Sequence, residues 1–567
     1  MTLKQLGGLY LLLSLALVLC APPCRAAVYV VDQAHPGASD ENPGTETAPW
    51  ATIARSIREA RPGDTVCVMA GSYPERAVLT TSGAPGRPIV FRSRPAHGAL
   101  TRGFECEGVS HVRIEGFSIR ADTPADRTPG IDLGSEGHVE VVGNDVAEMY
   151  MGISGGGRGC LVARNRTFRT QYGLLVGAQS VGWTIERNDF RRQFQHRSGD
   201  CDYSRMWGKD HVVRYNRYHD TRRSEVGQAH LDCIQTFNVR QNPDQYLQNL
   251  TFERNVCSDF SQGFMLSTSL PGTVHTFMFR QNIFSQGGSW GLNVKRIPRC
   301  TSANNTFYHI KWYGFGNAGG ENGRAQNNIF VQINTPYTTG PGFVGERNLV
   351  YECDEMGEDA AAGEFFEATP RFADAEAGNF RLTERSAAID AGIDGADVGA
   401  LDYPNVYYVD VAHPAADDEG YGYGGWPFRT LGRALSVARD GETIVVREGV
   451  YRESVDLAGR DVSVTAAEGE VARICTAALV TGWKRPDGRW VAPLPVRPER
   501  LLHDGRPLAD FDYDEATSTL TVRGFDPRLH AVEVPNAFSI SARDADVLEG
   551  NGIRICESFA PPVSGQQ

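Results

Sequence analysis

QNIFSQGGSWGLNVKRIPRCTSANNTFYHIKWYGFGNAGGENGRAQNNIF, residues 281–330, contains one short phrase three times: QNIF, NNTF and NNIF. The asparagine of this phrase recurs through the middle of the chain at intervals of 20 to 39 residues, at Asn144, Asn165, Asn188, Asn216, Asn255, Asn282, Asn305, Asn328 and Asn348. Such a period is typical of a β-solenoid, in which each repeat is one coil stacked on its neighbours. The longest intervals indicate loops inserted into two of the coils.

Asparagine suits the corner of such a coil. It tolerates the left-handed backbone conformation, and its amide can bond to the backbone or to the asparagine one coil above. Side chains alternate along a strand, so the apolar residue two positions later, such as Phe284 after Asn282, should point into the core. We therefore interpret the repeated asparagines as structural residues rather than catalytic ones.

A second phrase lies between the asparagine corners. It reads MGISG, YGLLVG, QGFMLST, WGLNVK and YGFGNA around Gly152, Gly173, Gly263, Gly291 and Gly314. The apolar residue that follows each glycine should point inward, and the glycine position outward. In the segment LDCIQTF, this alignment places Asp232 in the glycine position and turns Cys233 inward.

A longer repeat divides the chain. Residues 28–75 (VYVVDQAHPG…GSYPE) and 406–453 (VYYVDVAHPA…GVYRE) match at a constant offset of 378. Both contain a strand, a loop, a short amphipathic helix (residues 52–60 in the first copy) and a turn. A helix at the end of a solenoid covers the unpaired strand edges of its first coil. We predict one domain at 28–405 and a second, apparently incomplete, solenoid entrance at 406–567 that carries a small β-sandwich-like insert.

The bulk properties limit the class of partner. The formal net charge is −13, which disfavours nucleic acid as a partner but leaves an anionic polysaccharide possible in a local basic groove. Lys4, the apolar run 9–20 and the small residues that follow predict a signal peptide at 1–27, and hence a secreted or periplasmic protein. No later segment is apolar enough to span a membrane, and we expect a monomer. A disulfide within Cys201, Cys233, Cys257 and Cys300 is one possibility.

The segments VYVVD, PWATIARSIREARPGDTVCVMAGSYPE and SAAIDAG resemble the opening and closing coils of the pectate-lyase-like superfamily of right-handed parallel β-helix proteins. The resemblance implies an all-β fold with three parallel sheets per coil and an N-terminal capping helix. It also implies a carbohydrate-active lyase, hydrolase or epimerase that works in a groove on the outside of one sheet.

The strongest candidate site is QAHLDCIQTF, residues 228–237. With Leu231 and Cys233 inward, His230 and Asp232 point outward on one face, about 7 Å apart along the strand. LDCIQ loosely resembles the NTDGI strand of the polygalacturonases, whose Asp is catalytic. Their adjacent Asp pair and GHG motif are not found here, so hydrolysis is the second interpretation.

Basic and aromatic residues lie two coils further on, in WGLNVKRIPR. Lys295 and Asn293 share the outward face, and two coils put Lys295 about 10 Å from Asp232. A uronate lyase needs a base for the proton α to the carboxylate and a cation to stabilise the enolate. We predict Asp232, His230, Lys295 and Arg296 as catalytic residues. Substrate would bind to Asn293, Arg299, Trp207 and Trp290.

The loop before Asp232 offers a D-x-D pair, Asp200 and Asp202, whose oxygens could bind Ca²⁺. Together these features predict an exported enzyme that cleaves a uronate-containing polysaccharide by β-elimination. A hydrolase or epimerase on the same groove, and a non-catalytic carbohydrate-binding protein, remain open alternatives.

Overall fold

The computed structural model describes residues 26–238, 245–268, 276–355, 364–457, 459–535, 537–540 and 542–556. Nearly all of the predicted signal peptide therefore lies outside the described residues. Within the described part of the chain, no helix is both long and apolar enough to cross a membrane.

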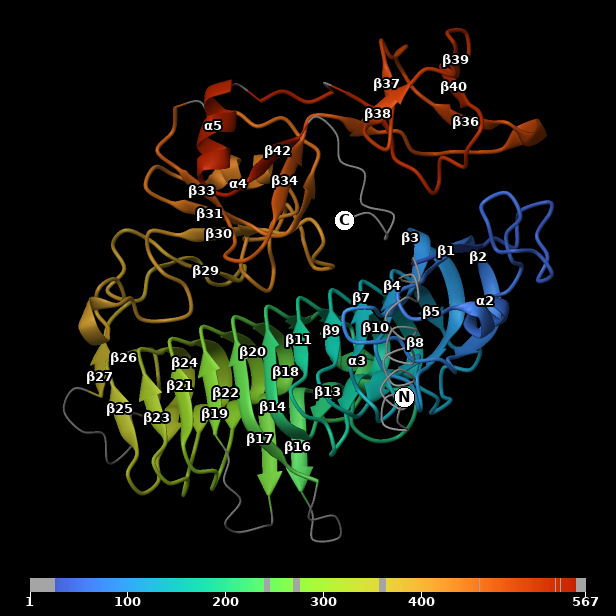
Figure 1. Cartoon of the computed structure of the whole chain (residues 1–567). Coiled ribbons are helices and arrows are strands. Elements are labelled where there is room, and N and C mark those ends of the chain that lie inside the picture. The colour runs from blue at the N-terminus through green and yellow to red at the C-terminus, as the bar shows by residue number, and fades with distance from the viewer. Residues whose placement is uncertain are drawn as a thin grey trace, which may run out of the picture.

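Parallel strands dominate the chain and form a long solenoid (Figure 1). A strand pairs with the equivalent strand of the next coil, as when β20 pairs with β22 and β22 pairs with β24. The strands of this sheet are β1 (Val28–Val31), β2 (Thr65–Val78), β3 (Ile89–Glu105), β4 (Val112–Glu115), β5 (Ser118–Arg120), β6 (Ile131–Asp132), β7 (Val139–Val142), β8 (Asp145–Gly155), β9 (Leu161–Ala163), β10 (Arg166–Val176), β11 (Thr184–Glu186), β12 (Asp189–Arg191), β13 (Asp202–Met206), β14 (Gly208–Arg214), β15 (Arg217–His219), β16 (Asp232–Asn238), β17 (Leu247–Glu253), β18 (Val256–Thr268), β19 (Phe277–Arg280), β20 (Ile283–Asn293), β21 (Cys300–Ala303), β22 (Thr306–Gly316), β23 (Arg324–Gln326), β24 (Ile329–Thr338), β25 (Val344–Glu346), β26 (Asn348–Tyr351) and β27 (Phe365–Glu367). The all-β class and the parallel coils are confirmed, while the right hand of the winding stays a prediction.

The repeated asparagines form a ladder through the solenoid. Asn282 donates from its side-chain amide to Oδ1 of Asn305 at 2.9 Å and to the carbonyl oxygen of Phe252 at 2.8 Å. Asn305 is bonded to Asn328 in the same way. The left-handed backbone belongs to the residue before each asparagine, such as Gln281 (φ 54°), which corrects the prediction for the corner. The asparagine itself is buried and satisfies the backbone groups that this corner exposes.

The inward residues of the same phrase stack coil upon coil. Phe284, Phe307 and Phe330 are fully buried, and their rings stack with centroids 5.2 and 5.0 Å apart. This aromatic column fills the core where the sequence placed the apolar residue two positions after each asparagine, which confirms that prediction.

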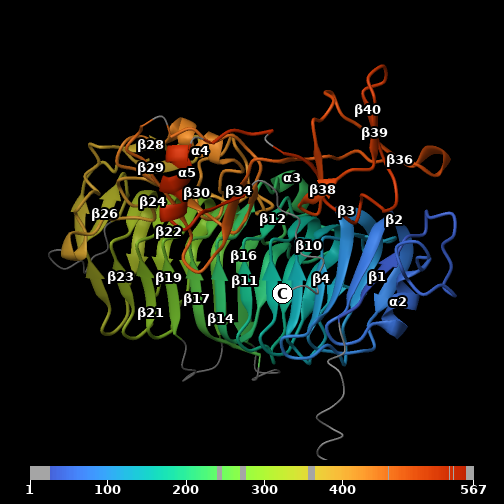
Figure 2. The ribbon, with the colours of Figure 1, turned by 45° about the horizontal axis from the view of Figure 1, so that its top comes forward.

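A short helix stands at each of the two repeated segments. Helix α2 (Ile53–Glu59) begins after Thr52, whose hydroxyl accepts from the backbone N–H of Arg55, and Glu75 accepts from the N–H of Ile53 at 2.7 Å. Helix α4 (Leu431–Val437) repeats this cap with Thr430 and Glu453. Figure 2 shows α2 at one end of the solenoid. The helix predicted at 52–60 is therefore present.

The segment 370–403 departs from the prediction that it forms terminal coils. Strands β28 (Phe372–Asp374) and β29 (Asn379–Leu382) pair antiparallel. Their side chains join a cluster with Val256, Ile283 and Ile329 on the outer side of the solenoid. The segment thus turns back and covers outward-facing apolar residues that the solenoid would otherwise expose.

The C-terminal part begins with β30 and contains two small parallel sheets. One is β30 (Val406–Val409), β31 (Thr443–Val446) and β33 (Ser463–Ala466); the other is β32 (Gly449–Tyr451), β34 (Ala472–Cys475) and β42 (Arg554–Cys556). Helix α5 (Ala542–Gly550) follows the insert, and β42 then pairs with β34. A disulfide joins Cys475 to Cys556, and the four cysteines considered in the sequence are free and buried.

The predicted β-rich insert lies between β34 and β42. It consists of two antiparallel sheets, formed by β35 (Ala478–Leu479), β36 (Trp490–Pro493), β37 (Leu501–His503), β38 (Arg506–Leu508), β39 (Phe511–Asp514), β40 (Thr519–Val522) and β41 (Val532–Val534). Its own core includes Trp490, Leu501 and Leu520. The insert therefore packs around a hydrophobic centre of its own.

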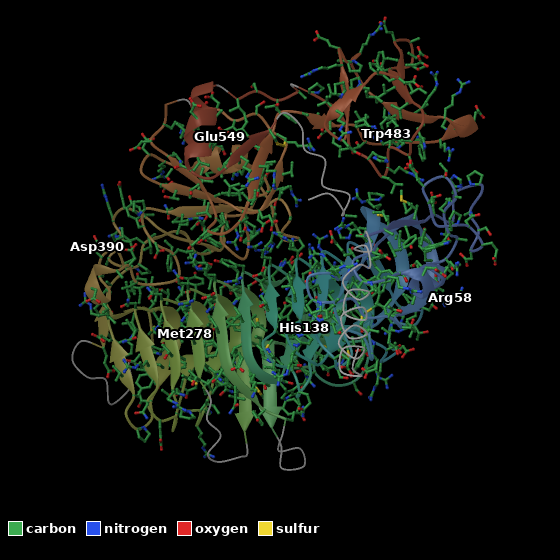
Figure 3. All side chains as sticks on the ribbon, viewed as in Figure 1. Arg58, His138, Met278, Asp390, Trp483 and Glu549 are labelled. Atoms are coloured by element: carbon green, nitrogen blue, oxygen red, sulfur yellow. A yellow bond between two sulfur atoms is a disulfide. The ribbon has the colours of Figure 1, made fainter. Side chains whose placement is uncertain are left out.

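The C-terminal part folds back along the first solenoid (Figures 1 and 2). Buried Arg187 forms an ion pair with Glu470, and Arg166 donates to the carbonyl oxygen of Pro414 at 2.6 Å. In Figure 3 the insert, marked by Trp483, lies on the side of the molecule that carries Arg58 of α2. The two parts of the chain are thus joined by direct polar contacts.

Candidate functional site

The strand that carries Asp232 is shifted by one residue from its predicted alignment. Asp232 pairs with Gln262, and Ile234 pairs with Phe264, so Cys233 occupies the position of Gly263. A Cβ built on Gly263 would lie 2.6 Å from the ring of Phe284, so this position faces the core and not the solvent. Cys233 is accordingly buried in the core cluster, as predicted, but Asp232 does not replace a glycine.

Pairing along the solenoid instead aligns Asp232 with polar and aromatic residues. Gln262 of β18 pairs with Trp290 of β20, which pairs with Tyr313 of β22. On the other side, Tyr172 of β10 pairs with Asp202 of β13. This column, Tyr172, Asp202, Asp232, Gln262, Trp290 and Tyr313, forms the candidate site.

His230 and Asp232 form a dyad. Nδ1 of His230 lies 3.1 Å from both carboxylate oxygens of Asp232. The Asp232 side chain is fully buried, whereas that of His230 is 43% exposed. Within the described part of the chain, no hydrogen-bond partner is found for Nε2 of His230. The buried carboxylate therefore holds a half-exposed imidazole by one nitrogen and leaves the other available to a substrate.

Further hydrogen bonds fix the carboxylate of Asp232. It accepts from the backbone N–H of Gln262 at 3.1 Å and from the side-chain amide of Gln235 at 3.2 Å. Its own backbone N–H donates to Oδ1 of Asp202 at 3.2 Å. Neither glutamine was predicted: Gln262 approaches through the register between coils, whereas Gln235 lies three residues after Asp232 on the same strand.

Asp200 and Asp202 lie beside the dyad and share one cation, Arg205. Its guanidinium contacts Oδ2 of Asp202 at 2.6 Å and Oδ2 of Asp200 at 2.9 Å, and it lies 4.4 Å above the ring of Tyr172. The predicted Ca²⁺ ligands are thus bridged by a guanidinium, so a calcium ion would have to displace Arg205. Arg205 was not predicted either, although its spacing of three residues from Asp202 offered a signal.

Burial sets the protonation of this cluster. Burial raises the pKa of the Asp202 carboxyl well above its usual range, the negative charge of Asp232 adds to this, and Arg205 opposes it. Burial also raises the pKa of Asp232, against the hydrogen bonds from His230 and Gln235. The hydrogen bond to Asp232 raises the pKa of His230. The pair of buried carboxyls therefore takes up a proton at a higher pH than free aspartate, and His230 stays charged to a higher pH than free histidine.

Two of the predicted residues reach the site. Asn293 donates to Oε1 of Gln262 at 2.7 Å, and Gln262 in turn contacts Asp232. Lys295 lies in the turn after β20 with its Nζ 4.2 Å from the ring centroid of Trp290.

The predicted aromatic platforms are not available for stacking. The ring of Trp290 stacks on Tyr313 with centroids 4.2 Å apart, and Trp290 is only 8% exposed. Trp207 is buried and donates from Nε1 to the carbonyl oxygen of Phe237 at 2.7 Å. Both rings pack within the protein, so the geometry gives no support to their predicted contacts with substrate.

Arg296 and Arg299 are exposed in the turn between β20 and β21, and both have left-handed backbone (φ 60° and 56°). Their backbone N–H groups donate to Ala318 and Glu321 of the next coil. Among the described residues, no hydrogen bond or ion pair links either side chain to the dyad. Their predicted roles stay predictions without geometric support.

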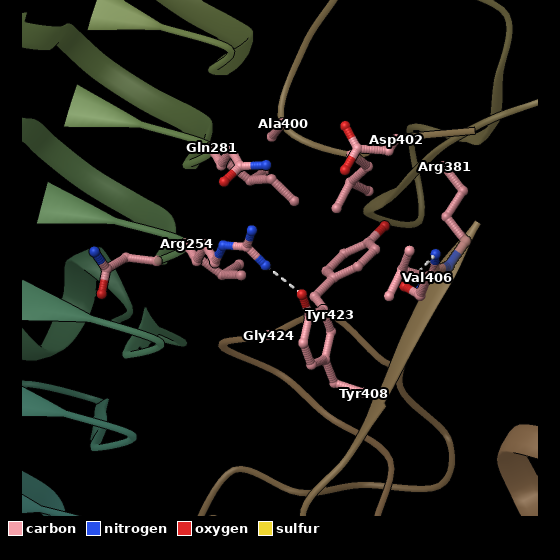
Figure 4. Close-up of a pocket in the computed structure, with 13 residues that line it drawn as sticks. Arg254, Gln281, Arg381, Ala400, Asp402, Val406, Tyr408, Tyr423 and Gly424 are labelled. Carbon is pink, nitrogen blue, oxygen red and sulfur yellow. Dashed lines mark hydrogen bonds between the residues drawn. The ribbon is translucent and has the colours of Figure 1, made fainter. Parts of the chain in front are cut away.

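A separate pocket lies where the C-terminal part meets the solenoid (Figure 4). Arg254 donates to the hydroxyl of Tyr408 in this pocket, and Arg381 extends over the ring of Tyr407 at 3.9 Å. These side chains join the two parts of the chain to each other. The pocket is therefore an interdomain contact and not part of the candidate site.

Comparison with solved structures finds polysaccharide lyases at low sequence identity. The chain overlaps the pectate lyase Pel9A over 67% of its own length and 96% of that chain, with 14% identity and a TM-score of 0.43. It overlaps the alginate lyase AlyGC of family PL6 over 74% of its length and 67% of that chain, with 14% identity and a TM-score of 0.38. The chain is similar to the pectate-lyase-like β-helix proteins. At this identity the likeness is one of fold alone.

Sequence comparison adds little. No family model matches the chain. The uncharacterized protein YwoF of Bacillus subtilis (strain 168) is 34% identical over 85 residues, which is 15% of this chain and 18% of that protein. The match thus spans less than a fifth of this relative.

Proposed function

We propose that the protein is an exported enzyme that cleaves a uronate-containing polysaccharide by β-elimination at the His230–Asp232 dyad. The observation that carries the proposal is the half-exposed imidazole of His230, held through Nδ1 by a fully buried carboxylate. This arrangement fixes the ring and leaves Nε2 as a general base. The solenoid fold and the carbohydrate-active neighbours are consistent with it.

In the proposed reaction, Nε2 of His230 takes the proton at C5 of a uronate residue. The electron pair forms the C4–C5 double bond, and the bond from C4 to the glycosidic oxygen breaks. That oxygen takes up a proton as it leaves. Lys295 is the exposed cation on this face, and its ammonium would stabilise the negative charge that develops on the uronate carboxylate.

The test is to incubate the purified protein with pectate, alginate and glycosaminoglycans and to follow absorbance near 235 nm, where the unsaturated product absorbs. Replacing a general base reduces the rate by about 10²- to 10⁴-fold, which we expect for His230→Ala. The control is His309→Asn, an exposed histidine outside the site whose left-handed backbone (φ 52°) asparagine tolerates. Equal activity of the two variants would refute the role of His230.

The pH profile tests the dyad itself. His230 must be uncharged to accept a proton, and Asp232 raises its pKa. We therefore expect the wild-type rate to rise with pH, with its midpoint above the ordinary histidine pKa of about 6.5. In Asp232→Asn the midpoint should move to lower pH, because the neutral amide no longer stabilises the imidazolium. A midpoint that does not move would contradict the dyad.

A second candidate is hydrolysis. It is favoured by the raised pKa of the buried carboxyls Asp202 and Asp232, since a carboxyl that keeps its proton can serve as a general acid. New reducing ends without absorbance near 235 nm would favour this reaction. Epimerisation would show only as a change in the NMR spectrum of the polymer, and binding without any product would indicate a non-catalytic carbohydrate-binding protein.

A further inference from the structure

A second cluster of chemically active side chains lies in the insert, far in sequence from the dyad. His503 ends strand β37, Asp504 follows in the turn, and His530 stands two residues before β41. Strands β37 and β41 pair antiparallel, with His503 opposite Val532. This pairing brings the three side chains together, so that one potential ligand atom from each lies within 4.8 Å of the others.

The carboxylate of Asp504 lies between the two imidazoles. Its Oδ2 is 2.6 Å from Nδ1 of His530 and 3.7 Å from Nε2 of His503. Its Oδ1 accepts from the backbone N–H of Ala531 at 2.8 Å, which fixes the carboxylate. Nitrogen and oxygen ligands at about 2.0–2.2 Å from a tetrahedral ion lie roughly 3.4 Å from one another. Shifts of under about 1 Å would therefore bring these atoms to coordination distance.

Nε2 of His503 is buried and has no hydrogen-bond partner among the residues that the structure describes, although the ring is held in place by stacking on Phe525 with centroids 3.9 Å apart. A buried polar atom without a partner destabilises a fold, by about 1–3 kcal/mol. The stacked ring thus holds Nε2 toward the Asp504 carboxylate, 3.7 Å from its Oδ2 and outside hydrogen-bond distance. A bound cation would satisfy this atom.

The second nitrogen of His530 has a partner from the other end of the chain. Its Nε2 lies 3.3 Å from Oε2 of Glu46, in the loop after β1. Histidines that bind a metal through one nitrogen commonly donate from the other to a carboxylate, which orients the ring and increases its basicity. Glu46 is placed to do this if Nδ1 of His530 binds the ion.

We propose that His503, Asp504 and His530 bind a divalent transition-metal ion of the zinc class, with Glu46 orienting His530. Two imidazoles and one carboxylate favour such an ion over Ca²⁺ or Mg²⁺, which prefer all-oxygen sites. The four side chains are 22–33% exposed, so an ion can enter from solvent. Three protein ligands leave a fourth position for water.

The site lies at the contact between the insert and the first solenoid. Arg528 of the insert contacts Asp32 at 2.6 Å, and Glu46 also accepts from the backbone N–H of Asp526. Metal binding at His530 would therefore strengthen the attachment of the insert to the N-terminal loop. The site is independent of the His230–Asp232 dyad, so either proposal can fail without the other.

The test is a Zn²⁺ titration of the full-length mature chain, freed of its purification tag and of metal, in competition with a chromophoric chelator. We expect one ion per chain and an affinity at least about tenfold weaker in His503→Ala and His530→Ala. We expect Glu46→Gln to weaken Zn²⁺ binding by about 10- to 100-fold, which is the usual effect of losing a carboxylate that orients a metal-binding histidine. His97→Asn, an exposed histidine with left-handed backbone (φ 63°), should bind as the wild type does.

Two further measurements sharpen the result. Co²⁺ should give the visible absorption of a four-coordinate site in the wild type and lose it in His503→Ala. Millimolar Ca²⁺ should not displace Zn²⁺. His503 takes no part in the ion pairs that hold the insert to the solenoid, so we expect His503→Ala to fold. Its Zn²⁺ affinity therefore tests the proposed site even if His530→Ala does not fold. Absence of stoichiometric binding, or equal affinity in wild type and His503→Ala, would overturn the proposal.

Discussion

The asparagine ladder allows a stability prediction that can be worked out bond by bond. Oδ1 of Asn255 accepts from the backbone N–H of Asn216 at 2.9 Å and from its side-chain amide at 3.0 Å. The amide of Asn255 donates to the carbonyl oxygen of Val213 at 3.0 Å and to Oδ1 of Asn282 at 3.1 Å. All of these groups are buried. Asn255→Ala would leave the backbone N–H of Asn216 without an acceptor in the solenoid interior.

An orphaned buried donor costs about 1–3 kcal/mol, and the other lost bonds and the space left by the amide add to it. We expect Asn255→Ala to lower the free energy of unfolding by about 3–5 kcal/mol. The assay is urea denaturation followed by circular dichroism, with hydrogen exchange of the amides in β14 and β17 to locate the loss. Because the chain has more than one part, the two-state model is applied only to the unfolding transition of the first solenoid.

The control is Ser258→Ala, three residues after Asn255 and within β18. The hydroxyl of Ser258 contacts the exposed carboxylate of Asp259 at 3.3 Å, and removal of such a surface contact changes stability by under about 0.5 kcal/mol. If Asn255→Ala is no more destabilising than Ser258→Ala, or if exchange near Asn216 is unchanged, the ladder does not stabilise the coils and the reasoning is wrong.

Three shorter predictions follow from other contacts. Arg187→Ala removes the ion pair of the buried Arg187 with the partly buried Glu470, so limited proteolysis should release the C-terminal part faster than in the wild type. Reduction of Cys475–Cys556, which are 81 residues apart, should destabilise the C-terminal part by about 4 kcal/mol in thermal unfolding and leave the first solenoid unchanged. Burial raises the pKa of Asp202, so its stabilising contribution is present at low pH and is lost as pH rises through that pKa. The unfolding free energy of the wild type should therefore fall relative to Asp202→Asn as pH rises above the ordinary aspartate pKa of about 3.9, and parallel curves would contradict this.

The sequence alone determined the solenoid. The asparagine period, the phenylalanine two positions after Asn188, Asn282, Asn305 and Asn328, and the repeated segment at an offset of 378 are local patterns that recur, and each coil meets similar neighbours. The sequence also placed His230 and Asp232 on one face, since side chains two residues apart share a face of a strand. Their direct contact was not predicted, because His230 lies just before β16 and its ring turns toward the carboxylate. The β-rich insert was visible from its turn residues.

Only the tertiary structure decided which residues surround the dyad. The register between coils brings Gln262 to Asp232 and Arg205 opposite Gln235, and inserted loops of unequal length hide that register in the sequence. Whether Trp290 is an open platform likewise depends on Tyr313 in the next coil. The return of the C-terminal part onto the solenoid, which brings Glu46 to His530 across 484 residues, rests on contacts between surfaces that no local pattern encodes. The coils repeat because each strand pairs with an equivalent strand of the next coil. The candidate site forms where polar residues and inserted loops make the neighbouring coils unequal.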